Sequence, residues 1–349
     1  MKKTLIALAV AGLPAVSMAD VTIYGTLKGG IENVDNGNIN KTNVDDLGSR
    51  LGFKGTEDLG NGLKAIWQVE TGFALDGTGK DGTSSSGTFA NRESFVGLGS
   101  AYGSLRMGNL SNFQDSDMAQ VDYWEYNSNA LGLGVFTRDD TRIKNAVRID
   151  TANFGGFKGA FLYGTKEDLS NQSKDRETYN LGLSYENSGF FGKYAYTHET
   201  ALSNGPSNDK HRLEAGYNAN NLYVALGYQQ NKGDYSVTAL PMLSNIDTDP
   251  NSAASNDKYK SKEYALTAGY SFGALTPKIT YAQGDDVERN GNSIDGTGYK
   301  QWILGVDYAL SKRTTLGAQY GELKYDGYNL ANPDENKIKA FGVNMIHSF

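Results

Sequence analysis

Apolar and polar residues alternate in short segments along almost the whole chain. In the first segment, residues 21–28, Ile23 and Leu27 fall on one face and Tyr24 and Lys28 on the other. A period of two is typical of a β-strand that separates an apolar surface from a wet one. Sixteen segments show this pattern: 21–28, 50–55, 63–70, 94–98, 105–107, 145–150, 157–164, 179–185, 190–198, 212–217, 222–228, 264–270, 275–281, 302–308, 314–320 and 341–349.

The connections between these segments alternate strictly between short and long. Seven are tight turns, and eight are long: 28–48, 72–91, 108–142, 165–177, 199–210, 230–261, 284–298 and 321–336. A barrel with short periplasmic turns and long extracellular loops explains this asymmetry, whereas a soluble sandwich or propeller does not. We therefore predict an all-β fold, a 16-stranded antiparallel transmembrane β-barrel. Its closed sheet would pair every backbone group in lipid and enclose an aqueous channel.

The composition agrees with this prediction. The chain has 22 tyrosines, 14 phenylalanines and 43 glycines but only 6 prolines, a balance typical of strands joined by many turns. Beyond the N-terminus, no run approaches the about 20 apolar residues that a membrane-spanning helix needs. A negative mean hydropathy does not exclude a barrel, because only alternate residues of each strand face lipid.

The first residues predict export. Lysines at positions 2 and 3 precede a short apolar run at 5–16, and Ser-Met-Ala at 17–19 fits a small-x-small cleavage site. We predict that residues 1–19 are a signal peptide and that 20–349 form one barrel domain. Cleavage takes the formal net charge from −7 to −9, since two lysines and no acids are lost. An acidic chain without cysteine argues against nucleic acid as a partner and excludes disulfides and thiolate metal sites.

Five motifs resemble one known family. They are VTIYG at 21–25, SRLGFKGTEDLGNGLKA at 49–65, RESFVGL at 92–98, NFGGF at 153–157 and the terminal Phe349. In this order they are similar to the trimeric general porins of Gram-negative outer membranes, in the branch of neisserial and other β-proteobacterial porins. The resemblance spans the whole chain.

The resemblance implies a homotrimer in the cell outer membrane and passive diffusion of ions and small hydrophilic solutes. It also implies that the third long connection, 108–142, folds into the lumen and narrows the pore. In this family the C-terminal aromatic, here Phe349, is the signal for the outer-membrane assembly machinery. The partners that we predict are therefore identical subunits, that machinery, and outer-membrane lipids and lipopolysaccharide.

The resemblance further implies a pore in which basic wall residues face acids of the third loop. Parity directs Arg50, Lys64 and Arg106 to the wet face of their strands. The predicted basic wall is Arg50, Lys64, Arg92, Arg106 and Arg148, and the predicted acidic side is Asp115, Asp117, Asp122 and Glu125. A transverse field between the two sets would orient dipolar solutes. The alternative for each charge is a solvated residue of the lumen or rim with no special role.

Enzymatic motifs give no support for catalysis. Residues 269–273 match G-x-S-x-G, but they fall on a predicted hairpin rather than on the strand-to-helix turn that this motif requires. We predict no catalytic residue, no cofactor and no metal. Two alternatives stay open: a structural or adhesive surface barrel, and a substrate-specific channel. The latter would need an aromatic track, to which Tyr24, Tyr123, Trp124 and Tyr126 could contribute.

Overall fold

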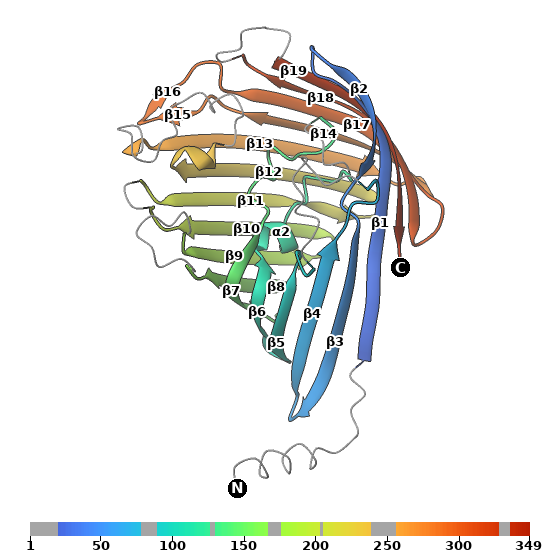
Figure 1. Cartoon of the computed structure of the whole chain (residues 1–349), viewed down its shortest axis with the longest axis vertical. Coiled ribbons are helices and arrows are strands. Elements are labelled where there is room, and N and C mark those ends of the chain that lie inside the picture. Colours follow the sequence, from blue (N-terminus) through green and yellow to red (C-terminus); the bar gives the residue numbers. More distant parts are fainter. Residues whose placement is uncertain are drawn as a thin grey trace.

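Antiparallel strands make up most of the chain and close into a ring (Figure 1). The computed structural model describes residues 20–77, 89–125, 130–166, 176–202, 205–238, 256–327 and 336–349. The predicted signal peptide and Tyr126 lie outside these ranges. In the described part, nineteen strands form one sheet, and no helix has the length and apolar character needed to cross a membrane.

Sixteen of these strands build the barrel wall, and three are additions to it. The wall consists of β1 (Asp20–Asp35), β3 (Arg50–Gly60), β4 (Leu63–Gly72), β5 (Ser94–Ser100), β6 (Gly103–Ser111), β7 (Arg142–Thr151), β8 (Phe157–Gly164), β9 (Thr178–Asn187), β10 (Phe190–Glu199), β11 (Asn208–Ala219), β12 (Leu222–Gly233), β13 (Tyr259–Tyr270), β14 (Leu275–Gly284), β17 (Tyr299–Ala309), β18 (Thr314–Tyr325) and β19 (Lys337–Ser348). The additions are β2 (Asn40–Asp46), β15 (Glu288–Arg289) and β16 (Asn292–Ser293). The prediction of a closed 16-stranded antiparallel barrel is confirmed.

The first and last strands close the barrel. β1 pairs with β19 from Thr26 opposite Ser348 to Asp35 opposite Lys339. Beyond this ladder, the Gly25 N–H donates to the Phe349 carbonyl at 3.1 Å, and the Phe349 N–H donates back at 3.0 Å. A sheet closed in this way has no free lateral edge, so its backbone groups are paired without help from water.

The first long connection is shorter than its predicted range of 28–48. β1 continues to Asp35, and β2 pairs back along it from Gly29 opposite Asp46 to Asp35 opposite Asn40. A strand that extends beyond the bilayer has water on both sides, so its sequence does not need one apolar face. The alternation therefore fades although the strand goes on. For the same reason, the predicted loop 284–298 conceals the small β15–β16 hairpin.

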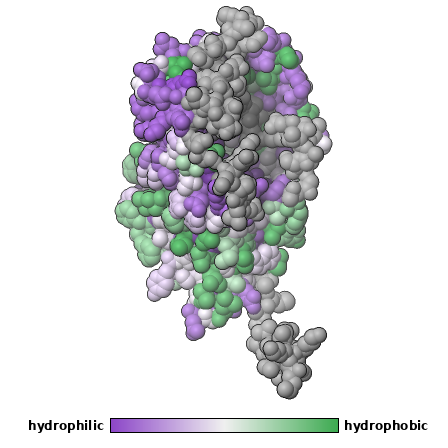
Figure 2. Space-filling model, turned by 60° about the vertical axis from the view of Figure 1, so that its left-hand side comes forward, coloured by the Kyte–Doolittle hydropathy of each residue, from purple (hydrophilic) through white to green (hydrophobic). Residues whose placement is uncertain are grey.

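The two faces of the wall differ as the alternation predicts. Outward positions hold apolar side chains that are left uncovered, such as Leu183, which is 51% exposed, and Phe190, which is 64% exposed. Figure 2 shows hydrophilic residues gathered at one end of the molecule and hydrophobic residues on the flank below them. This distribution matches a flank in lipid and a rim in water.

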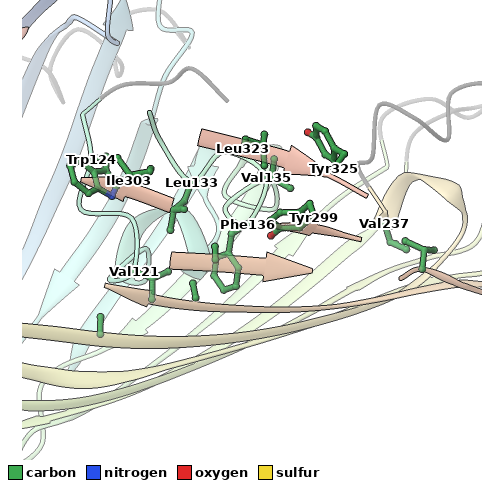
Figure 3. Packing of buried hydrophobic residues seen from close by; sticks show 14 of the residues in the cluster. Val121, Trp124, Leu133, Val135, Phe136, Val237, Tyr299, Ile303, Leu323 and Tyr325 are labelled. Atoms are coloured by element: carbon green, nitrogen blue, oxygen red, sulfur yellow. The ribbon is translucent and has the colours of Figure 1, made fainter. Parts of the chain in front are cut away.

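The hydrophobic core lies inside the barrel, between the wall and the segment that follows β6. This segment begins with a short helix, α2 (Phe113–Asp117), whose N-terminus is capped by Asn112: its side chain accepts from the Asp115 N–H. Farther along, Val121, Leu133 and Phe136 pack against inward-facing residues of the wall such as Ile303 and Leu323 (Figure 3). The third long connection is thus packed against the inner wall.

Candidate functional site

We call residues 112–141 the inner loop; side chains of the inner wall hold the backbone of its described parts, 112–125 and 130–141. The Lys193 ammonium on β10 donates to the Asp117 carbonyl at 2.7 Å. The Gln301 amide on β17 donates to the Gly132 carbonyl at 2.8 Å, and the Gln319 amide on β18 donates to the Leu131 carbonyl at 2.9 Å. Because these three loop carbonyls accept hydrogen bonds from wall side chains, the irregular loop is held in place at these points.

Glycines on the inner face provide the space for this packing. A Cβ atom on Gly182 would lie 2.0 Å from the Phe113 ring, and one on Gly305 would lie 2.7 Å from the Trp124 ring. Gly227 accommodates the Phe136 ring in the same way. The wall strands therefore make room for the rings of the inner loop because these inward positions are glycines, which have no side chain.

Ion pairs fix the second half of the inner loop to the far wall, formed by β11 to β13. The Arg138 guanidinium makes two hydrogen bonds to the Glu263 carboxylate, at 2.5 and 2.6 Å. Asp139 pairs with Lys210 at 3.1 Å, and Asp140 pairs with Arg212, which is 1% exposed. Burial alone would raise the pKa of Asp139, but the neighbouring cations outweigh it and lower that pKa to about 2.

Arg148 fixes the beginning of the loop to the near wall. Its guanidinium donates to the Asp117 carboxylate at 2.7 Å and to the Ser111 carbonyl at 2.8 Å, and it also pairs with Asp150 at 2.7 Å. With 2% of its side chain exposed, this arginine contacts the loop directly and does not face it across water. Asp115 is similarly close to Arg142, at 3.5 Å.

Arg92 and Arg106 carry partners from the wall itself. Arg92 pairs with Glu70 at 2.6 Å, and the Tyr24 hydroxyl donates to the same carboxylate at 2.9 Å. Arg106 bridges Glu93 and Asp150, both at 2.7 Å. Burial raises the pKa of Glu93, against the opposing effect of Arg106. These pairs neutralise most of the charge of the two arginines.

Arg50 is the exception in this group. It is partly exposed and forms no ion pair within the described ranges of the chain. It lies opposite Gly72 in the β3–β4 ladder, and the Arg92 side chain passes 3.2 Å from the position of a Gly72 Cβ. Arg50 and Arg92 are therefore neighbours. Lys54, on the same face of β3, is exposed and lies 5.1 Å from the Tyr24 ring centroid.

The structure does not bring Lys64 to this group. Lys64 shares the inward face of β4 with Glu70. In the β3–β4 ladder, however, it lies opposite Asp58, next to the short turn after β3. Lys64 is eight residues from Gly72, which corresponds to about 27 Å along an extended strand.

We define the wall cluster as Arg50, Lys54, Glu70, Arg92, Glu93 and Arg106.

The loop acids divide between three surroundings. Asp115 and Asp117 face arginines of the near wall, as described above. Asp122 is partly buried and accepts from the Leu133 N–H at 3.4 Å, and burial raises its pKa to about 6. Glu125 reaches Lys28 on β1 and pairs with it. The four predicted acids therefore all lie in the first half of the inner loop.

Sequence reasoning missed several members of this network. Lys28 and Glu70 lie on the polar faces of predicted strands, so the alternation of the sequence could have placed both side chains in the lumen. Arg142, at the end of the predicted loop range, carried no such signal. The buried pairs of Arg138 with Glu263 and of Arg212 with Asp140 join residues far apart in the chain, and no local pattern identifies them.

Comparisons with known proteins agree on one family. Residues 4–328 match the family described as Gram-negative porin. The chain is 36% identical over 387 residues to the major outer membrane protein P.IB of Neisseria sicca, and 36% identical over 370 residues to that of Neisseria meningitidis serogroup B, with 100% of both chains covered in each case.

Solved structures show the same fold. An anion-selective porin from Comamonas acidovorans superimposes with a TM-score of 0.75 at 22% identity, covering 95% of this chain and 100% of that one. OmpF of Salmonella typhi, in complex with daunomycin, gives a TM-score of 0.66 at 19% identity, covering 95% and 98%. At these identities, the two structures support the barrel architecture.

The Arg138–Glu263 pair yields a prediction about how the loop is held. Arg138→Leu leaves the Glu263 carboxylate buried without its cation, which we expect to cost about 3–5 kcal/mol. Urea unfolding in detergent should show this loss, and limited proteolysis should cut the inner loop faster. The double variant Arg138→Leu, Glu263→Leu is the matched control and should recover most of the stability. Equal stability of the single variant and the wild type would contradict the anchoring role.

Proposed function

The chain belongs to the Gram-negative porin family and forms a general diffusion channel of the outer membrane; we propose that the wall cluster and the acids of the inner loop set the charge selectivity of this channel. The relatives named as porins favour a channel over an enzyme. The single observation that carries the proposal is Arg50, a partly exposed cation on the inner wall without an ion pair in the described part of the chain.

The charged residues along the lumen differ in whether a neighbouring charge compensates them. In the wall cluster, Glu70 and Glu93 offset Arg92 and Arg106, while Arg50 and Lys54 keep their charge. On the loop side, Asp117 and Asp115 are offset by Arg148 and Arg142. A solute that passes the inner loop therefore meets a surplus of positive charge on the wall. This surplus should raise the local concentration of anions.

A substrate-specific channel finds less support. Trp124, one of the aromatic residues that could form a track, is 7% exposed and donates its indole N–H to Thr280 at 2.8 Å. The Tyr24 hydroxyl is bound to Glu70. Tyr123 is 40% exposed but stacks on Tyr223, with ring centroids 4.8 Å apart. Three side chains committed to separate partners do not form a continuous surface for sugar rings.

We propose that residues 1–19 are removed, that 20–349 form the mature barrel with 108–142 as its constriction, and that three copies associate. OmpT of Vibrio cholerae, a structural neighbour at 16% identity, is described in a trimer form. We also propose that the barrel contacts outer-membrane lipids and lipopolysaccharide and that the assembly machinery recognises the C-terminal strand.

Replacing Arg50 tests the selectivity. Arg50→Ala should lower the permeability of anions relative to cations by about two- to fivefold, since one unit charge near the pore is worth about 1 kcal/mol in water. Reversal potentials in salt gradients across planar bilayers give this permeability ratio.

The conductance in the same membranes tests the alternative of an adhesive barrel. We expect a large, linear conductance from a diffusion channel and none from a barrel that serves only adhesion.

Lys64→Ala is the matched control for this experiment, because it removes a cation from the same face far from the wall cluster. It should leave the ratio unchanged. A shift as large as that of Arg50→Ala would favour the sequence-based assignment of Lys64 to the constriction. Unchanged selectivity in the Arg50→Ala, Arg92→Ala double variant would refute the role of the wall cluster.

Asp122 predicts a pH dependence. With a pKa raised to about 6, this carboxyl binds a proton as the pH falls from 7.5 to 5, and the loop then loses one negative charge. The permeability of cations relative to anions should therefore fall over this range. Asp122→Asn should show the low-pH value throughout and no inflection near pH 6. An inflection that survives in Asp122→Asn would assign the titration to another group.

Phe349 predicts a defect in assembly. Deleting it removes the two backbone hydrogen bonds to Gly25 and the ring that packs over this glycine. We expect less assembled oligomer in outer-membrane fractions, measured by gel migration without heating. Phe349→Tyr keeps the backbone contacts and an aromatic ring and should restore the yield. A normal yield after the deletion would argue against a signal at this terminus.

A further inference from the structure

A cavity of about 300 Å³ lies in the inner wall where β1, β3, β4 and β5 run side by side (Figure 1). We call it the wall pocket. Lys54, one of the residues that line it, is four residues from Arg50 along β3 in the direction of the short turn, which corresponds to about 14 Å along a strand. The wall pocket therefore lies on the short-turn side of Arg50. Six of its lining residues are Thr22, Lys54, Thr56, Ile66, Gln68 and Phe95.

The strand register brings these side chains together. Thr22 lies opposite Lys54, Lys54 lies opposite Gln68, and Gln68 lies opposite Phe95. Four neighbouring strands thus contribute one residue each to a single row across the wall. Because alternate residues of a strand share a face, this row turns to the lumen like Arg50. Residues that are up to 73 positions apart in the sequence therefore surround one space.

The two sides of the wall pocket differ in chemistry. On β4 and β5, Ile66 and Phe95 present apolar surface. Ile66 lies opposite Gly97, and a Cβ atom on Gly99 would be 3.5 Å from an Ile66 methyl group, so glycines stand where β5 side chains could cover Ile66. The Phe95 ring is held by the Arg106 guanidinium, which lies 5.2 Å from the ring centroid. This apolar side is therefore formed without a ligand.

The opposite side, on β1 and β3, is polar and carries one positive charge. Of the described residues that line the wall pocket, Lys54 alone is charged, and it forms no ion pair within the described ranges. The Glu70 carboxylate, two residues beyond Gln68, is already bound to Arg92 and to the Tyr24 hydroxyl. The Lys54 ammonium thus keeps its charge beside an apolar surface.

Hydroxyl groups accompany this cation. Thr22 and Thr56 are exposed, and their hydroxyls make no hydrogen bond within the part of the chain that the structure describes. Each can donate to an oxygen of a ligand. The Gln68 amide, by contrast, donates to the Glu93 carbonyl at 3.3 Å. The donors that remain are on the β1–β3 side with Lys54, so an anionic group belongs there.

We propose that the wall pocket binds small organic monoanions with an apolar ring, such as aromatic carboxylates. The carboxylate accepts from Lys54 and from the two threonine hydroxyls, and the ring covers Ile66 and lies against Phe95. A volume of about 300 Å³ is at the lower end of the range for ligand pockets, which fits one ring and excludes larger ligands. The proposal rests on the channel function and does not depend on the proposed role of Arg50 in selectivity.

The test uses para-fluorobenzoate as the probe. Its fluorine resonance is followed by NMR as purified protein in detergent micelles is added, with protein-free micelles as the reference. We expect saturable broadening with a dissociation constant in the millimolar range, because the ligand is small and the site faces the lumen. Unlabelled benzoate should displace the probe. Acetate, which lacks the ring, and benzamide, which lacks the charge, should each require roughly fivefold higher concentrations or more.

Two variants change one side of the wall pocket each. Lys54→Gln removes one unit charge at contact distance and should weaken binding of the probe about fivefold. Ile66→Asn keeps the charge and removes apolar contact, which should weaken binding about threefold. The matched control is Lys64→Gln, a cation on the same face of β4, about 14 Å along the strand from Gln68. This distance exceeds the screening length of about 8 Å at physiological salt, so the control should bind like the wild type.

Equal affinity of Lys54→Gln and the wild type would overturn the proposal. Displacement of the probe by acetate at the same concentrations as benzoate would also overturn it, because the site would then accept any small anion. The comparison of the three competitors needs only the wild type, so it decides the question even where a variant does not assemble.

Reversal potentials of Arg50→Ala separate this proposal from the proposed selectivity. Tight dependence of probe binding on Lys54 and Ile66, together with an unchanged permeability ratio in Arg50→Ala, would contradict the selectivity alone. A lowered ratio in Arg50→Ala, together with equal probe affinity in Lys54→Gln, Ile66→Asn and the wild type, would contradict the wall pocket alone.

Discussion

The need to pair every backbone N–H and C=O inside a lipid bilayer governs the rest of this structure. An open sheet would leave one row of these groups without partners on each edge, at a cost of several kcal/mol per group. The pairing of β1 with β19, from Thr26 to Asp35, removes both edges. Once the sheet is closed, each strand must turn one face to lipid and the other to the lumen. The alternation of the sequence and the location of all polar function follow from this division.

A closed barrel of this size would be hollow without the inner loop, and the loop depends on the wall for its own order. In its described parts, 112–125 and 130–141, it has almost no regular structure beyond the five residues of α2. Three of its carbonyls accept from Lys193, Gln301 and Gln319, and its rings occupy spaces left by inward glycines such as Gly182 and Gly305. The wall therefore has two functions on its inner face: it holds the loop along one side and leaves charged residues free along the other.

The charges of the molecule differ mainly in whether they are compensated. Arg148, Arg138 and Arg212 are almost fully buried and bound to carboxylates, and such pairs maintain a position rather than act on a distant solute. Arg50, inside the barrel, has no such partner among the described residues. Its charge is then compensated by water and mobile ions, which leaves it able to act on solutes in the lumen.

The sequence by itself determined the barrel, because a period of two needs only neighbouring residues and is set by the lipid on one side. It also predicted Arg50 and Arg106 on the inward face and the third connection as the one with a special role. The tertiary structure decided which charges meet. Lys64 has the right parity, but it lies about 27 Å along β4 from Gly72, the residue opposite Arg50 in the ladder. Arg148 is buried and anchors the inner loop. The height of a charged residue in the barrel and its ion pairs depend on the register between strands that are distant in sequence. A local sequence pattern contains no information on that register.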